Sequence, residues 1–266
     1  MSGERSTRWL TSPRFGELAA AGSLVVLVPV GSFEPHGPHL SLETDTEISL
    51  GAAERAAARL DRHGLSARVA PPVPYGVTEC ARAFPGAVSV PAASLTAYLG
   101  AVVDGFLAAG AAHVCLVNNH LEPAHDRAVR AALDGRDRAR VSVACPLTRR
   151  WARTLSDEFK SGACHAGRYE TSLALARDAR LCDEAARAGL PEVPVSLSDK
   201  LRAGIDDFAA MGLDRAYAGA PAAATPAEGD DLFDRLADMV VGEVLDALRA
   251  PGSASEPGPA TPTPGR

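Results

Sequence analysis

The sequence predicts an α/β fold over residues 1–250, a single layered α/β/α domain with a mainly parallel sheet. Short runs of β-branched and apolar residues alternate with longer segments whose apolar residues recur at helical spacing. The first of these runs is apolar throughout, as expected for a strand that helices cover on both faces. With 266 residues, of which 46% are hydrophobic, the chain can bury the core that such a domain needs.

The first half of the chain contains two predicted strand and helix pairs. Residues 24–30 are rich in Val and are predicted to form a fully buried strand. In residues 45–60, apolar and alanine positions recur with the period of a helix. The next strand is predicted at 67–70, where two prolines stop it, and the next helix at 94–109.

The second half continues this alternation and closes with a long helix. Strands are predicted at residues 113–117 and 140–145, with a helix between them that begins near Pro123. Residues 228–248 carry a stripe of Leu and Val at helical spacing, which predicts an amphipathic helix. The alanine-rich segment 216–227 is interpreted as an ordered loop.

Composition excludes several classes of protein. The net charge of −6 leaves no positive surplus for nucleic acid or an anionic membrane, which favours a small-molecule or peptide partner. No apolar run reaches the roughly 20 residues of a membrane-spanning helix, and no long apolar signal core follows the polar start, so a cytoplasmic location is predicted. The five scattered cysteines indicate neither a disulfide framework nor a thiolate zinc site. Residues 251–266, rich in Pro, Gly and Ser, are predicted to be a disordered tail.

Residues of the types that bind metals gather after two of the predicted strands. Glu34 and His36 follow the first strand, His120 and Glu122 follow the third, and Asp45 stands at the head of the first helix. Side chains two residues apart in an extended segment point to the same side. Because ligands of open α/β sheets bind outside the carboxyl ends of the strands, these five residues are predicted to form one metal site.

The composition of this site indicates its chemistry. Two imidazoles and three carboxylates suit Zn²⁺, Mn²⁺ or a similar divalent ion. A carboxylate left to bridge indicates two ions roughly 3.5–4 Å apart, between which a water becomes hydroxide near neutral pH. His39 is interpreted as a donor that orients a ligand carboxylate, whereas His63, His113 and His125 are interpreted as structural.

Five motifs in this chain resemble those of the creatininase family and occur in the family's order. The first reads G-S-F-E-P-H-G-P-H-L and is followed by T-D-T at the next helix. The later ones read F-P-G-A-V-S, N-N-H-L-E and H-A-G-R-Y-E-T-S, followed by a loop rich in Gly and Pro. The resemblance runs from about residue 9 to residue 250, and its segments are residues 31–40, 44–46, 84–89, 118–122, 165–172 and 217–229.

The resemblance implies a creatininase-like fold and a metal-dependent amidohydrolase. Such an enzyme cleaves a C–N bond of a small cyclic amide, formamide or related amide with a hydroxide held by two metal ions. The family pattern implies that Asp45 bridges the ions, that Glu34 and His120 bind one, and that His36 and Glu122 bind the other. Zinc is the first choice of metal, with manganese or iron(II) as alternatives.

The resemblance also implies the remaining catalytic residues and the assembly. His165 becomes the acid–base residue that passes a proton to the leaving nitrogen, and Glu170 orients His165 or the substrate amine. The resemblance allows several classes of substrate: creatinine-like lactams, formylaminopyrimidines, cyclic polyol ketones and a small modified peptide. The family usually forms hexamers, so a homo-oligomer is expected.

Two departures from the family pattern indicate changed substrate recognition. Leu121 stands where creatininase proper has an aromatic residue, and Trp151 is a candidate to compensate for it. Cys80 and Ala81 stand where relatives usually have a His beside Glu79. The metal-binding half of the pattern is therefore intact, and the recognition half is altered.

Three alternative interpretations stay open. A cysteine hydrolase could use Cys164 with His165 as its base, although adjacent residues seldom bring a thiol against its own base. A non-catalytic metal-binding or small-molecule sensor protein would keep the site without turnover. A peptidase that acts on a small modified peptide is the third alternative.

Overall fold

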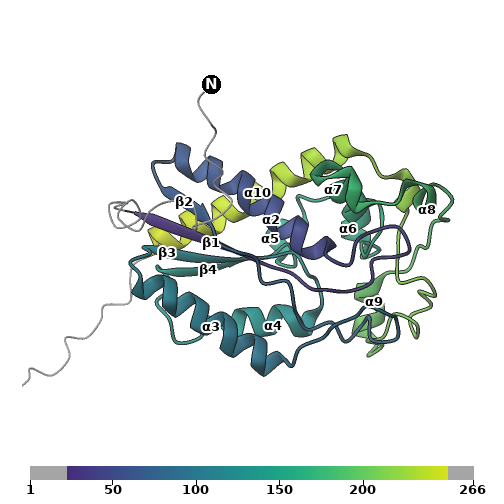
Figure 1. Cartoon of the computed structure of the whole chain (residues 1–266), viewed down its shortest axis with the longest axis horizontal. Helices are drawn as coiled ribbons and strands as arrows, with labels where there is room; N and C mark the ends of the chain where they lie inside the picture. Colours follow the sequence, from purple (N-terminus) through teal and green to yellow (C-terminus); the bar gives the residue numbers. More distant parts are fainter. Residues whose placement is uncertain (1–22, 251–266) are drawn as a thin grey trace, which may run out of the picture.

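A computed structural model describes residues 23–250 of the chain (Figure 1). Within this range, parallel strands form one sheet in the order β2-β1-β3-β4. The strands are β1 (Leu24–Val30), β2 (Ser66–Val69), β3 (His113–Asn118) and β4 (Val141–Ala144). The predicted mainly parallel sheet is therefore confirmed. The tail predicted at residues 251–266 lies outside the described residues.

Helices cover both faces of the sheet (Figure 1). On one face lie α2 (Thr44–Arg62) and α10 (Pro226–Arg249), and on the other lie α3 (Ala92–Ala108) and α4 (Pro123–Ala131). These helices and the four strands begin and end within about two residues of the predicted bounds. For α4 only the beginning was predicted. The layered α/β/α architecture follows from this arrangement.

Each central strand is buried on both of its faces because its side chains alternate between the two helical layers. In β1, Val25 and Leu27 pack in the core beneath α2 and α10. Val26 and Val28 pack in the core beneath α3 and α4. This two-sided burial is the physical reason for the uninterrupted apolar run in the sequence.

The segment between β4 and α10 contains short helices that the sequence analysis did not predict. Four of these five helices have only four to six residues, which is too short to show a hydrophobic period. The longest of them packs against both α2 and α10. These helices are α5 (Arg149–Ala152), α6 (Asp157–Ser161), α7 (Arg168–Arg177), α8 (Glu184–Ala188) and α9 (Leu197–Arg202).

The sheet reverses its strand order between β1 and β3. These strands are neighbours, and their last residues, Val30 and Asn118, are paired in the parallel register. From β1 the chain crosses to β2 on one side, and from β3 it crosses to β4 on the other. Loops that leave in opposite directions open a crevice at the carboxyl ends of the strands. The two predicted ligand loops both border this crevice.

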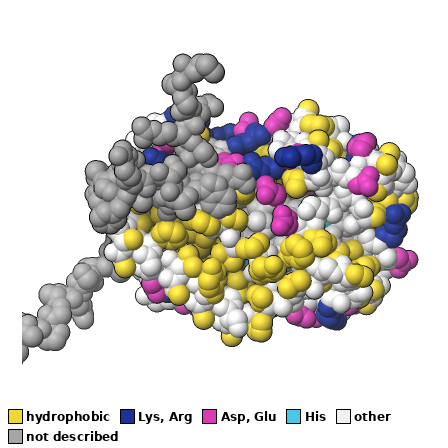
Figure 2. All heavy atoms as spheres, viewed as in Figure 1, with side chains coloured by type: hydrophobic (Ala, Val, Ile, Leu, Met, Phe, Trp, Pro, Cys, Tyr) yellow, Lys and Arg dark blue, Asp and Glu magenta, His cyan; other side chains and the backbone are white. Residues whose placement is uncertain are grey.

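One face of the molecule is rich in exposed apolar side chains. Figure 2 shows hydrophobic side chains gathered over the lower part of this face, where α3 lies in Figure 1. Tyr75, Val88 and Tyr98 are among the large hydrophobic residues that are more than a third exposed. The only charged residue of α3, Asp104, pairs with Arg136 at 2.6 Å. No helix among residues 23–250 combines the length and apolar character needed to cross a membrane.

Candidate metal centre and active site

The crevice between β1 and β3 holds four of the five predicted ligands in direct proximity. Glu34 and His36 lie in the loop after β1, His120 lies in the loop after β3, and Asp45 lies in the first turn of α2. All four side chains are buried, with at most 3% of each residue exposed. Segments far apart in the sequence thus converge because β1 and β3 are neighbours in the sheet.

These side chains form two groups that could each hold a metal ion, and Asp45 belongs to both. One group consists of Glu34, Asp45 and His120, and the other of His36, Asp45 and Glu170. Asp45 Oδ2 lies 2.9 Å from His120 Nδ1, and Asp45 Oδ1 lies 3.2 Å from His36 Nε2. Within each group the ligand atoms lie within 4.8 Å of one another. Asp45 thus lies between the two groups, and its role as a bridge between two ions stays a prediction.

The orientation of three imidazoles shows what the groups are suited to bind. Each ring has one nitrogen at hydrogen-bonding distance from a backbone carbonyl: His36 Nδ1 from Glu34 (3.1 Å), His120 Nε2 from Val77 (2.8 Å) and His165 Nε2 from Pro35 (3.0 Å). A carbonyl only accepts, so these nitrogens donate. The opposite nitrogens of His36 and His120 face carboxylates: they carry protons when no metal is bound and would offer lone pairs to a metal ion when the rings are neutral.

An imidazole nitrogen and a carboxylate oxygen at hydrogen-bonding distance repel each other unless a proton or a metal ion lies between them. His120 Nδ1 and Asp45 Oδ2 face each other at 2.9 Å, yet the oxygen has no hydrogen-bond partner among the described residues. A ring N–H bound to a backbone carbonyl is the usual way in which a protein orients a metal-binding imidazole. The donor set and its orientation therefore fit a divalent metal ion.

The pKa shifts in the centre also indicate a site for cations. Burial opposes the charged form of His36, but the charges of Asp45, Glu170 and Glu34 raise its pKa to about 10. Burial likewise opposes ionisation of Asp45, but the nearby imidazoles His36 and His120 hold its pKa well below the usual range. The carboxylates thus create a strongly negative, buried environment that favours bound cations.

Glu122 lies beside these groups rather than in them. Its two carboxylate oxygens accept hydrogen bonds from the backbone N–H groups of Glu79 and Cys80, at 3.2 and 3.0 Å. Burial raises the pKa of Glu122 although these hydrogen bonds lower it. It still lines the same cavity as His120. Glu170, predicted to orient other groups, instead stands in the group with His36 and Asp45.

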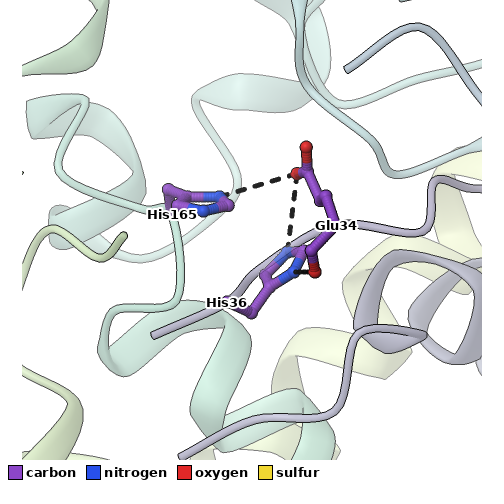
Figure 3. Close-up of side chains that lie close together, drawn as sticks. All are labelled: Glu34, His36 and His165. Atoms are coloured by element: carbon purple, nitrogen blue, oxygen red, sulfur yellow. Dashed lines mark hydrogen bonds and ion pairs between the residues drawn. The ribbon is translucent and has the colours of Figure 1, made fainter. Parts of the chain in front are cut away.

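His165 lies next to the candidate metal positions (Figure 3). Its ring centroid is 4.5 Å from that of His36, and its Nδ1 lies 3.9 Å from Glu34 Oε1. These three residues form a further group that could hold a metal ion. Burial, with a smaller effect of His36, lowers the pKa of His165 to about 4, so its ring is neutral near pH 7.

The cysteine alternative is disfavoured by the surroundings of Cys164. Burial, together with the charges of Glu170 and Glu158, raises the pKa of its thiol far above the usual range. A catalytic cysteine needs the opposite shift, because the thiolate is the nucleophile. His165 meanwhile donates to a backbone carbonyl and not to Cys164.

A cavity of about 660 Å³ opens onto the candidate metal centre. Much of its wall is apolar, with side chains that come from the loop after β3 and from the segment with the short helices. The apolar lining includes Leu121, Leu147, Phe159, Leu197, Leu201 and Phe208. The two phenylalanines supply aromatic surface, and the Phe208 ring lies 4.4 Å from the ring of His165.

Trp151 does not compensate for the aromatic residue absent at Leu121. Its indole nitrogen donates to Glu243 on α10 at 2.5 Å, and its ring packs near Gly242. Trp151 is not part of the cavity lining, whereas Leu121 is. The sequence could not reveal this because Trp151 lies in a helical turn of four residues, Arg149–Ala152, which is too short for residue spacing to show which side the indole faces.

Several residues that support the centre were not predicted. The hydroxyl of Thr78 donates to Glu34 Oε2, and the Val77 backbone both accepts from His120 and donates to His125 Nδ1 at 3.2 Å. These residues lie in an irregular loop after β2, where no spacing of metal-binding types marks them. His39 bonds the hydroxyl of Thr171 at 2.9 Å, and no bond of His39 to a ligand carboxylate is found among the described residues.

Comparison with known proteins places the chain in a family. The model of the family described as "Creatininase: Creatinine amidohydrolase" matches residues 9–244. The chain belongs to the creatininase family. The predicted family and the predicted class, a creatininase-family hydrolase, are thereby confirmed.

Curated creatininase-family relatives differ in their named substrates. The mycofactocin precursor peptide peptidase of Mycolicibacterium smegmatis is 34% identical over 228 residues, which cover 82% of each chain. Its namesake from Mycobacterium tuberculosis is 33% identical over 257 residues, covering 90% of this chain and 94% of the relative. The creatinine amidohydrolase of Pseudomonas putida is 30% identical over 118 residues, covering 42% of this chain and 44% of the relative.

Solved structures confirm the fold. A structure described as "Creatininase Mn" superposes with a TM-score of 0.69 at 19% identity and covers 91% of this chain and 99% of its own. A creatinine amidohydrolase homologue from Bacteroides fragilis gives the same TM-score and identity and covers 93% of this chain and 98% of its own. The creatininase-like α/β/α architecture extends over nearly the whole of both proteins.

Proposed function

We propose that this creatininase-family hydrolase cleaves an amide C–N bond in a small modified peptide, with two divalent metal ions at its centre. One observation carries the metal-dependent part of the proposal: buried imidazole nitrogens face buried carboxylates while the opposite nitrogens donate to backbone carbonyls. The choice of a peptide is supported by the named activity of the Mycolicibacterium and Mycobacterium relatives, which share most of their length with this chain.

The size and lining of the cavity also favour a peptide over a small lactam. A volume of about 660 Å³ is room for about 20 water molecules at about 30 Å³ each. Leu121 presents an aliphatic side chain where creatininase proper has an aromatic residue, and Trp151 of α5 packs against α10 instead of lining the cavity. A cavity of this volume with a largely apolar lining suits several peptide residues and leaves a single flat ring poorly held.

The ligands divide between two ions. Glu34, Asp45 and His120 would hold one ion, and His36, Asp45 and Glu170 would hold the other. Zinc is our first choice, with manganese or iron(II) as alternatives, because imidazole and carboxylate ligands suit all three. Such a pair of ions supplies a water-derived nucleophile at neutral pH and polarises the amide carbonyl.

Glu122 and His165 would carry out the proton chemistry. The carboxylate of Glu122 is fixed by two backbone N–H groups, lines the cavity and has a raised pKa, so it can hold a proton for the leaving nitrogen. His165 is oriented by the Pro35 carbonyl and presents Nδ1 near Glu34, where it can accept a hydrogen bond from the substrate amide or amine. Glu170 would be a metal ligand in this scheme, and Glu122 would not.

The test combines metal analysis with hydrolysis assays on the wild type and Asp45→Asn. The substrates are short apolar peptides, lactams and formamides, each assayed with zinc, manganese or iron(II). We expect about two ions per chain in the wild type, hydrolysis of peptides above all, and loss of both ions and activity in Asp45→Asn. Hydrolysis that survives complete chelation would contradict the metal-dependent mechanism. Full metal occupancy without hydrolysis of any amide would favour the sensor alternative.

We also propose a homo-oligomer, a hexamer by family resemblance. The apolar face along α3, where Tyr98 is exposed, supports it because a monomer seldom exposes such a patch to water. Light scattering should give a mass several times that of one chain, and Tyr98→Glu should lower it. A wild-type mass equal to one chain would contradict the assembly. The cytoplasmic location stays a prediction.

A further inference from the structure

The charged residues that line the cavity separate by sign and by depth. The lining carboxylates are buried and lie at or beside the metal groups: Glu34, Asp45, Glu122 and Glu170. The lining cations are exposed and come from α5 to α9: Arg149, Arg153, Lys160 and Arg202. Because exposed residues lie nearer the opening, the entrance is basic in a chain whose net charge is −6. Such an entrance attracts an anionic group.

Two of these cations have no ionic partner among residues 23–250. Lys160 pairs with Asp157 and Arg202 pairs with Asp199, each at 2.7 Å. No ion pair and no side-chain hydrogen bond is formed by Arg149 or Arg153 with the part of the chain that the structure describes. Their guanidinium groups are thus free to bind an external anion.

The local geometry of α5 turns both arginines to the same side. Arg149 and Arg153 are four residues apart, about one helical turn, and both line the cavity. Arg150, between them in the sequence, faces away: it pairs with Asp246 of α10 at 2.5 Å and stacks on Trp151. The same short turn therefore directs two arginines to the cavity and fixes a third to the protein.

We propose that Arg149 and Arg153 bind a carboxylate of the peptide substrate and thereby determine specificity. This inference rests on the proposed function. Guanidinium groups bind carboxylates through paired, charge-assisted hydrogen bonds. The apolar wall near them, with Leu147 and Leu201, holds an apolar side chain next to that carboxylate. The carboxylate belongs either to the peptide's C-terminus or to an Asp or Glu side chain, since both present the same chemistry.

The experiment measures equilibrium binding of three pentapeptides built from alanine, valine and phenylalanine to the metal-loaded protein. The first has a free C-terminal carboxylate, the second is its carboxamide, and the third is a carboxamide with one internal aspartate. The proteins are the wild type, the double variant Arg149→Gln/Arg153→Gln, and Arg150→Gln as the matched control. Circular dichroism and metal content establish that each variant is folded and loaded.

We expect the wild type to prefer a peptide that carries a carboxylate over the plain carboxamide. The double variant should bind that peptide about tenfold more weakly or worse, as expected for losing hydrogen bonds to a charged group. Its affinity for the plain carboxamide should not change, and Arg150→Gln should match the wild type throughout. Raising the salt concentration should weaken carboxylate binding in the wild type and leave the double variant unaffected.

The three peptides also distinguish the source of the carboxylate. Preference for the first peptide assigns it to the C-terminus, and preference for the third assigns it to a side chain. Equal binding of acid and carboxamide by the wild type, or equal binding of the acid by the wild type and the double variant, would overturn the inference. Failure of the proposed function has a different signature: the carboxylate preference persists, but the metal-loaded wild type hydrolyses none of the peptides.

Discussion

At the scale of single residues, the structure assigns different surroundings to two glutamates that the sequence presents alike. Glu170 Oε2 lies 3.5 Å from His36 Nε2 in a group that could hold a metal ion. Glu122 accepts hydrogen bonds from the backbone N–H groups of Glu79 and Cys80. These surroundings support our proposal that Glu170 is a metal ligand and that Glu122 carries a proton.

Glutamine substitutions separate these two roles. Glu170→Gln should lose one of the two ions, because the neutral amide is a much weaker ligand than a carboxylate. Glu122→Gln should keep both ions and a similar KM but lose kcat by about 10²-fold or more, the usual contribution of a general acid. Metal analysis and steady-state kinetics on the two variants check this. A Glu122→Gln protein with a single ion would restore Glu122 to the ligand set.

At the scale of elements, a glycine controls how closely the loop after β1 approaches α2. A Cβ atom on Gly31 would lie 2.6 Å from the backbone nitrogen and Cα of Thr46, closer than real Cβ atoms come to a neighbour. This contact holds the start of the loop with Glu34 against the start of the helix with Asp45. A side chain here would force the two ligand segments apart.

Gly31→Ala should accordingly lose metal and stability together. We expect destabilisation by about 1–3 kcal/mol from overpacking and a clear loss of bound metal. Gly105→Ala on α3 is the matched control, because nothing lies within 4 Å of its added methyl group. That variant should keep its metal and gain up to about 1 kcal/mol of helix stability. Thermal unfolding and metal content give the comparison, and equal behaviour of the two variants would refute the close-packing explanation.

The pairing of β3 with β4 contains a buried histidine that makes stability depend on pH. His113 Nε2 lies 2.8 Å from Ser142 Oγ and its Nδ1 lies 3.1 Å from the Ala139 carbonyl. Burial lowers the pKa of His113, so the unfolded chain binds a proton below pH of about 6.5 that the folded chain does not yet bind. The free energy of unfolding should therefore fall as the pH drops below about 6.5.

Substitution isolates this contribution from those of other histidines. The melting temperature of His113→Gln should change less between pH 7 and pH 5 than that of the wild type. Thermal unfolding at a series of pH values measures both slopes. Identical slopes would show that His113 keeps its ordinary pKa in the folded protein.

How much the sequence predicts also differs between elements. Strands buried on both faces and long helices leave a clear hydrophobic pattern, so β1 and α10 were predicted within two residues. The turns α5 and α9 were missed because four to six residues cannot show a period. Glu34, His36, Asp45 and His120 were predicted because they directly follow strands or begin a helix. The proximity of Glu170 to His36 and Asp45 was not predictable, since residue spacing does not show that the start of α7 lies beside the loop after β1.

At the scale of the whole molecule, the centre joins parts that are distant in the chain. Its candidate ligands come from the loop after β1, from α2, from the loop after β3 and from α7. The unfolded chain does not hold these segments together, so bound metal stabilises the folded state in proportion to its affinity and concentration. Stability and metal occupancy should thus rise and fall together.

Chelation makes this linkage measurable. Removing metal from the wild type should lower its melting temperature by several degrees, corresponding to roughly 2–4 kcal/mol if free metal is present at 100 to 1,000 times its dissociation constant. Asp45→Asn should melt at the same temperature with and without the chelator. Calorimetric scans test both statements, and a wild-type melting temperature unaffected by chelation would show that the centre does not stabilise the fold through metal.

The floor and the wall of the cavity come from different parts of the architecture. The loops that carry Glu34, His36 and His120 directly follow strands of the sheet, whereas Arg149, Arg153 and Leu201 lie in or next to short helices joined by irregular loops. Glu34, His36, Asp45 and His120 lie outside α5 and α9, so substitutions on the cavity side of these two helices should leave those four residues in place. This separation recommends the cavity-lining residues of α5 and α9 as the positions to randomise when a new specificity is sought.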